Sequence, residues 1–85
     1  MGMPDYEVLE ETEHLRFEYT GDSKSGKTKL IDVWSVKSQS FLGVIKWYGH
    51  WRKYVFDTEK AIYDTGCMRT ISDFIDKLME ERKEK

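Results

Sequence analysis

The hydrophobic pattern changes its period near the end of the chain, and this change limits the folds that the sequence can adopt. Up to about residue 63, apolar and polar residues alternate in short runs, as they do along half-buried strands. Beyond that point, apolar residues recur at spacings of three and four, which is the stripe of one amphipathic helix. The stripe consists of Met68, Ile71, Phe74, Ile75, Leu78 and Met79. We therefore expect an α+β fold: an antiparallel sheet of four to five strands with one C-terminal helix packed on one face.

The expected elements follow one another without a linker, which indicates a single domain over residues 1–85. Residues 1–13 are acidic and weakly patterned, so they are expected to be loosely ordered or to hold an early strand at Tyr6–Leu9. The sheet is expected over residues 14–63 and the helix over residues 65–82, with Asp64 or Thr65 as its N-cap. The predicted strands are residues 14–20, 29–37, 41–48, 51–56 and, as a short fifth, 61–63.

Size and composition narrow the function classes. A chain of 85 residues with 39% apolar residues has little volume for a deep substrate cavity, so we expect no enzyme. The single cysteine, Cys67, excludes an internal disulfide, favours a cytoplasmic location and is expected to be a small buried apolar residue rather than a reactive thiol. No apolar run approaches the roughly 18 residues of a membrane span. Because His14, His50 and Cys67 lack metal-ligand spacing, neither a metal nor another cofactor is expected.

Charge is distributed unevenly along the sequence. The net charge of −2 divides into −5 over residues 1–20, +4 over residues 21–60 and −1 over residues 61–85. A basic middle between acidic ends permits a basic face, although the whole molecule is no polycation.

Residues 21–28, GDSKSGKT, match the phosphate-binding P-loop pattern, in which Gly21, Gly26, Lys27 and Thr28 would hold phosphates and a magnesium ion. That motif needs a helix directly after the loop, so that the helix N-terminus faces the phosphate. Residues 29–34 are patterned as a strand instead. We therefore interpret the segment as a hairpin loop and keep nucleotide binding as a third hypothesis.

Residues 41–56, FLGVIKWYGHWRKYVF, hold six of the twelve aromatic residues and are expected to form a hairpin. With Gly49-His50 as a two-residue turn, Trp47 faces Arg52 as a cation–π pair and Lys46 faces Lys53. A four-residue loop would shift these pairs. The face expected under the helix carries Phe41, Gly43, Ile45, Trp47, Arg52, Tyr54 and Phe56. The other face carries Leu42, Val44, Lys46, Tyr48, Trp51, Lys53 and Val55.

Basic and aromatic side chains on an open sheet are typical of single-stranded nucleic-acid binders. Our first hypothesis is therefore a module for single-stranded DNA or RNA, in which Lys46 and Lys53 contact phosphates and Tyr48 and Trp51 stack on bases. A second hypothesis is a protein-interaction or inhibitor module, or a homodimer formed through an edge strand. As a purely structural alternative, the lysines protect the sheet from aggregation and the Tyr–Trp pair closes the hairpin.

Residues 42–56 resemble small phage- and prophage-type proteins of unknown function that carry an L-G-x-I-K-W-Y-x-x-W-R-x-Y-x-F stretch. The resemblance continues into the helix led by Cys67-Met68 and spans roughly residues 28–80. It implies a mobile-element origin and no established activity. Separately, four strands followed by a helix are similar in topology to the PC4-type single-stranded DNA-binding fold, without its signature residues.

Overall fold

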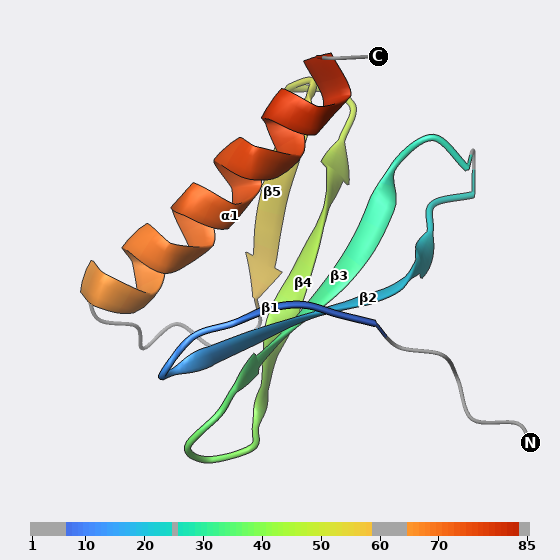
Figure 1. Ribbon diagram of the computed structural model, residues 1–85. Helices are drawn as coiled ribbons and strands as arrows, with labels where there is room; N and C mark the ends of the chain where they lie inside the picture. Colours follow the sequence, from blue (N-terminus) through green and yellow to red (C-terminus); the bar gives the residue numbers. More distant parts are fainter. Residues whose placement is uncertain (1–6, 25, 59–64, 84–85) are drawn as a thin grey trace, which may run out of the picture.

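Each strand of the sheet pairs antiparallel with the next strand of the chain, in the order β1-β2-β3-β4-β5, and one helix lies against one face (Figure 1). The computed structural model describes residues 7–24, 26–58 and 65–83. The elements are β1 (Glu7–Glu11), β2 (Leu15–Asp22), β3 (Lys29–Ser35), β4 (Phe41–Tyr48), β5 (Lys53–Thr58) and α1 (Thr65–Lys83). The predicted fold class is confirmed. β1 takes the place of the early strand expected at Tyr6–Leu9, while the predicted strand at 61–63 and the N-cap at Asp64 lie outside the described residues.

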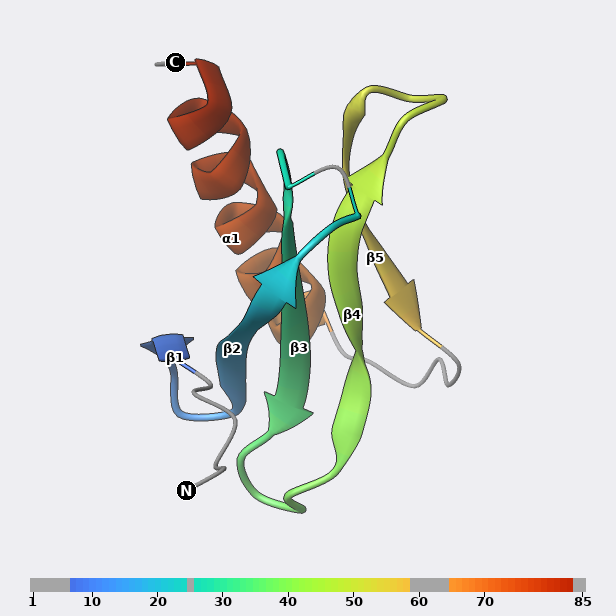
Figure 2. The ribbon, with the colours of Figure 1, turned by 90° about the vertical axis from the view of Figure 1, so that its right-hand side faces the viewer.

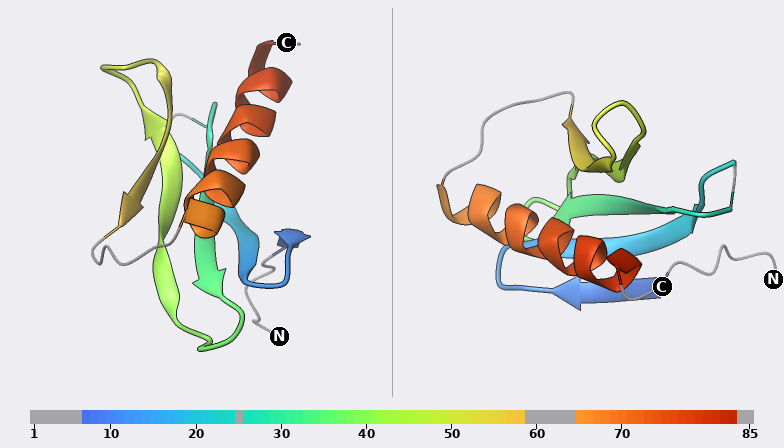
Figure 3. Two further views of the ribbon diagram at one scale, coloured as in Figure 1. Left: turned by 90° about the vertical axis from the view of Figure 1, so that its left-hand side faces the viewer. Right: turned by 90° about the horizontal axis from the view of Figure 1, so that it is seen from above.

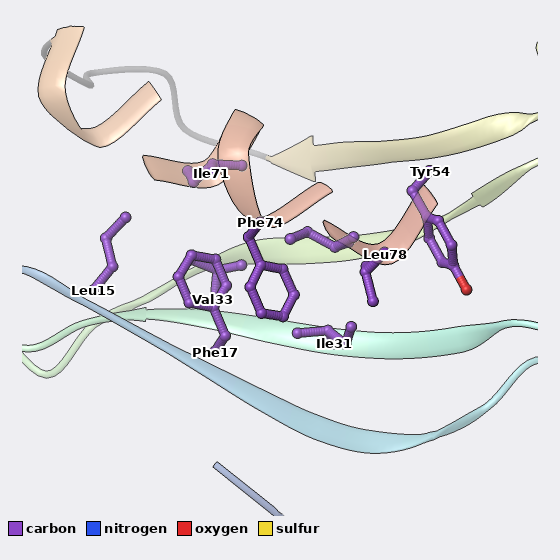
Figure 4. Packing of buried hydrophobic residues seen from close by; sticks show 9 residues of the cluster. Leu15, Phe17, Ile31, Val33, Tyr54, Ile71, Phe74 and Leu78 are labelled. Carbon is purple, nitrogen blue, oxygen red and sulfur yellow. The ribbon is translucent and has the colours of Figure 1, made fainter. Parts of the chain in front are cut away.

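The core lies between α1 and the sheet face toward it, as Figure 4 shows. The rings of Phe17 and Phe74 stack in parallel at its centre, with 4.2 Å between their centroids. The buried apolar side chains are Leu15, Phe17, Ile31, Val33, Ile45, Tyr54, Ile71, Phe74 and Leu78. The predicted helix stripe is confirmed except at Met68, which is 52% exposed. Cys67 packs against the core instead, because it lies four residues before Ile71 and seven before Phe74, on the same side of the helix.

The sheet curves around the helix, so that β1 and the β4–β5 hairpin lie on opposite sides of it (Figure 3). A bulge between Val8 and Glu10 turns β1 toward the helix, and the Glu10 carboxylate pairs with Nζ of Lys77 at 2.9 Å. At the C-terminal end of α1, the Arg82 guanidinium lies 4.2 Å from the centroid of the Trp47 ring. Arg82 thus takes the cation–π position that was predicted for Arg52.

A bulge between β3 and β4 corrects the predicted position of Phe41. Val33 pairs with Gly43, but Trp34 pairs with Phe41, so Leu42 is the extra residue. Leu42 packs against the core, whereas Phe41 turns to the opposite face and meets the Trp34 ring edge-on at 5.4 Å. The prediction assumed strict alternation along β4, and one inserted residue reverses the side on which Phe41 lies.

The β4–β5 loop has four residues, 49–52, so the two-residue turn at Gly49-His50 and a strand starting at Trp51 are wrong, and the four-residue alternative is correct. Tyr48 pairs with Lys53, and the Arg52 amide donates to the Tyr48 carbonyl at 2.9 Å. A two-residue turn needs positive φ at its central positions. In this loop Arg52 takes the left-handed conformation, with φ of 55°, and Gly49 does not. Lys46 therefore faces Val55 rather than Lys53.

Candidate binding surface on the open face of the sheet

The helix covers one face of the sheet and leaves the other uncovered, as Figure 2 shows from the uncovered side. We call this uncovered side the open face. Register and alternation place on it Val8, Glu11, Arg16, Glu18, Leu30, Asp32, Trp34, Phe41, Val44, Lys46, Tyr48, Lys53, Val55 and Asp57. It contains the strand residues on which the binding hypotheses rest.

The predicted aromatic pair, Tyr48 and Trp51, lies at the end of the open face next to the β4–β5 loop. The rings of Tyr48 and Trp51 meet edge-on with 4.9 Å between centroids, and the His50 ring lies 5.4 Å from Tyr48. Trp51 is 64% exposed and Tyr48 39%, and Lys53, opposite Tyr48, is also exposed. The structure therefore brings Tyr48, Trp51 and Lys53 together and leaves them accessible, as the sequence predicted.

Lys46 lies on the same face but is already engaged in an ion pair. Its Nζ is 2.9 Å from the Asp57 carboxylate, and both side chains are about half exposed. A second ion pair joins Nε of Arg16 to the Glu18 carboxylate at 2.7 Å. Two of the three cations of the open face are thus compensated by neighbouring acids, which weakens the attraction of this face for phosphate.

Acidic residues cross the middle of the open face in one register row. Val8 pairs with Glu18, Glu18 with Asp32, Asp32 with Val44, and Val44 with Asp57. Partial burial raises the pKa of the Asp32 carboxyl above its usual range, and the charge of Glu18 adds to the rise. Among the described residues, no ion pair or side-chain hydrogen bond reaches the Asp32 carboxylate. Sequence reasoning missed this row, because it depends on the strand register.

We expect Asp32→Asn to raise the free energy of unfolding at pH 7 by about 0.2–1 kcal/mol, because two acids directly opposite each other repel. The raised pKa means that the folded state holds the Asp32 proton more tightly than the unfolded state. Wild-type stability therefore falls as pH rises from about 3.8 through the raised value, and the advantage of the variant appears in that window. Urea denaturation of dilute protein at pH 7 and pH 3 measures it. Asp76→Asn, on the exposed side of α1, is the control, and an Asp32→Asn variant less stable than wild type at pH 7 would contradict the prediction.

Apolar side chains surround these charges. Trp34 and Phe41 form an aromatic pair at the end of the open face away from the β4–β5 loop, and Phe41 is 48% exposed. The large hydrophobic residues exposed in the described part of the chain are Val8, Phe41, Tyr48, Trp51 and Met68. All of these except Met68 belong to the open face or its adjoining loop. Such clustering on one face is typical of a protein–protein contact surface.

The phosphate-loop pattern lacks the structure that its chemistry needs. The segment 21–28 begins with the last two residues of β2 and ends directly before β3, so an antiparallel strand rather than a helix follows it. The Ser23 amide donates to the Thr28 carbonyl and the Gly26 amide to the Ser23 carbonyl, so the loop itself uses these donors. Thr28 is buried. The requirement of the third hypothesis, a helix N-terminus facing the phosphate, is therefore not met.

Residues 7–24, 26–58 and 65–83 hold neither a metal-binding cluster nor a membrane-spanning helix. In that part of the chain, no three histidine, cysteine or acidic side chains gather closely enough to hold a metal ion. The helix in the same residues, α1, is not apolar enough over the length that a membrane span requires.

Comparison with known proteins finds a relative in a phage. The chain is 38% identical over 80 residues to the "Uncharacterized 9.3 kDa protein" of Acholeplasma phage L2, and the match covers 89% of this chain and 97% of that protein. No protein-family model matches the chain. No solved structure matches it, so the topological likeness to PC4-type domains gains no support.

Proposed function

The chain belongs to the family of the Acholeplasma phage L2 protein, and on that premise we propose that it is a non-enzymatic protein-interaction module of mobile-element origin that binds its partner through the open face. One observation carries the proposal: the exposed large apolar side chains gather on this face, while most of its charges are already paired. Apolar and aromatic side chains with compensated charges suit another protein surface, because their burial is favourable and few charges lose their hydration.

Single-stranded nucleic acid is the second candidate. The side chains at the end of the open face next to the β4–β5 loop favour it. Tyr48 and Trp51 offer exposed rings for base stacking, and Lys53 and Arg52 are exposed beside them. The proposal of a protein partner has the stronger support because Glu18, Asp32 and Asp57 lie along the middle of the same face. A phosphate backbone that followed the face would approach these carboxylates.

Site-specific photo-crosslinking in cells that express the chain tests the proposal. A benzophenone side chain replaces Tyr48 on the open face in one variant and Met68 on the helix in the other, at comparable exposures of 39% and 52%. We expect irradiation to give a discrete adduct at position 48 that resists nuclease and is destroyed by protease, with no such adduct at position 68. Mass spectrometry then identifies the partner.

Two results would overturn the proposal in different ways. A nuclease-sensitive adduct at position 48 would assign the surface to nucleic acid, and a single-stranded oligonucleotide should then quench tryptophan fluorescence at low salt and lose this effect as salt rises. Equal labelling at positions 48 and 68, or none at either, would show that the open face is not a specific protein contact.

A further inference from the structure

The open face carries an acid and a base without an ion-pair partner among the described residues, on opposite sides of a group of apolar side chains around Lys46. Asp32 on β3 and Lys53 on β5 have no side-chain ion pair among the described residues. Lys53 lies two strands away from Asp32 across the sheet and four residues away along the strand direction. In a regular sheet this corresponds to a separation of roughly 16 Å. The side chains between them are largely apolar: Leu30, Val44, Tyr48 and Val55. Lys46, at the middle of this group, is paired with Asp57.

We propose that two copies of this chain pack open face to open face about a two-fold axis, with Asp32 of each copy against Lys53 of the other. The inference rests on the proposed function, because it names a second copy as the protein that the open face binds. A two-fold axis in the plane of the interface, midway between the two residues, exchanges their positions. One operation therefore pairs the Asp32 and Lys53 of each copy with the opposite charges of the other. It also places the Lys46–Asp57 ion pair of each copy near the axis and brings the apolar side chains around these pairs into contact.

A second copy fits this surface because the complementary charges lie on the same face. A partner of uniform charge would match either Asp32 or Lys53 and oppose the other. The partial burial of Asp32 adds to the argument, because a half-buried carboxylate without a partner is costly and a lysine from the second copy offsets that cost.

The size of the face is adequate for a dimer. A standard protein interface buries about 800 Å² on each partner, which is about an eighth of the 6413 Å² of accessible surface computed for this chain. Five strands of five to eight residues span a face of that order. Because the axis is perpendicular to the line from Asp32 to Lys53, the strands of the two copies cross at roughly 70°, closer to orthogonal than to aligned sheet packing, with the sheets about 10 Å apart.

Variants with reversed charges at positions 32 and 53 test the inference. Their dimerisation constants are measured by sedimentation velocity over a series of protein concentrations. We expect wild-type protein to dimerise as concentration rises. Asp32→Lys and Lys53→Asp should each weaken dimerisation at least about tenfold, since each places like charges in two symmetrical contacts. The double variant D32K/K53D should restore the dimerisation constant to within about threefold, because the charges exchange places in both contacts. The control variant D76K/K24D exchanges exposed charges away from the open face and should leave dimerisation unchanged.

Circular dichroism checks that each variant is folded, and Lys53→Asp, at an exposed position, keeps the test valid should Asp32→Lys fail to fold. Wild-type protein that stays monomeric over the whole series, or a folded double variant that does not recover, would overturn the dimer. Such a result leaves the proposed function standing if position 48 crosslinks to a different protein. A nuclease-sensitive adduct would remove both.

Discussion

Replacing Phe74 with alanine is expected to lower the free energy of unfolding by about 3–5 kcal/mol. Phe74 is buried at the centre of the helix–sheet contact, where its ring stacks on Phe17. The substitution removes a large buried surface and leaves a cavity that the rigid sheet cannot fill. A domain of this size has a total stability of roughly 4–13 kcal/mol, so the variant should be close to unfolding at 37 °C. Urea denaturation followed by far-ultraviolet circular dichroism measures the loss.

Met68→Ala on the same helix is the matched control for Phe74→Ala. Met68 is 52% exposed, so its loss should change the free energy of unfolding by less than about 0.5 kcal/mol. Phe74→Leu keeps most of the buried volume and should fall between the two. Equal denaturation midpoints for Phe74→Ala and Met68→Ala would show that the helix does not pack on the sheet through the Phe17–Phe74 stack.

Gly43→Ala is expected to destabilise the sheet by about 1–3 kcal/mol, although it adds a single methyl group. A Cβ at position 43 would lie 2.5 Å from the backbone carbonyl oxygen of Asp57 and 2.8 Å from the Phe56 ring. The ring can turn away, but the carbonyl belongs to the neighbouring strand, so the β4–β5 ladder must shift. The same denaturation experiment gives the magnitude.

Gly49→Ala is the control for the glycine substitution. No atom lies within 4 Å of a Cβ built at Gly49, and its backbone is not in the left-handed region. The Gly49 variant should therefore keep wild-type stability to within about 0.5 kcal/mol. A neutral Gly43→Ala would mean that β5 approaches β4 less closely at this point.

Periodicity was sufficient to predict the arrangement of the layers. The helix stripe through Ile71, Phe74 and Leu78 and the alternation through Leu15 and Phe17 both identify the side chains that meet in the core. These predictions succeeded because the burial of a side chain depends on which face of its strand or helix it occupies. The spacing of residues along the sequence is enough to assign that face. Gly43 and Phe56 share the face that alternation predicted for both, and the Phe56 ring lies beside Gly43 although Phe56 pairs directly with Ile45.

Features that depend on an inserted residue or on the choice between two loop lengths could not be predicted from the sequence. Phe41 and Leu42 are both large and apolar, so nothing in their order tells which one a bulge turns inward. The length of the 49–52 loop shifted each cross-strand pair of the hairpin, and the predicted Lys46–Lys53 contact disappeared with it. The exposure of Tyr48, Trp51 and Lys53 was predicted correctly, because exposure follows from the face. The compensation of Lys46 by Asp57 was not, because ion pairs depend on register.

Pairing between consecutive strands also sets an order of events during synthesis. Contacts between sequence neighbours form early, so the hairpins can assemble as the chain leaves the ribosome. The helix is made after all five strands. Until Ile71, Phe74 and Leu78 emerge, the nascent sheet holds Phe17, Ile31 and Ile45 uncovered on one side while the open face is bare on the other. In that interval the chain has two uncovered apolar faces, and packing of the helix onto the sheet leaves one.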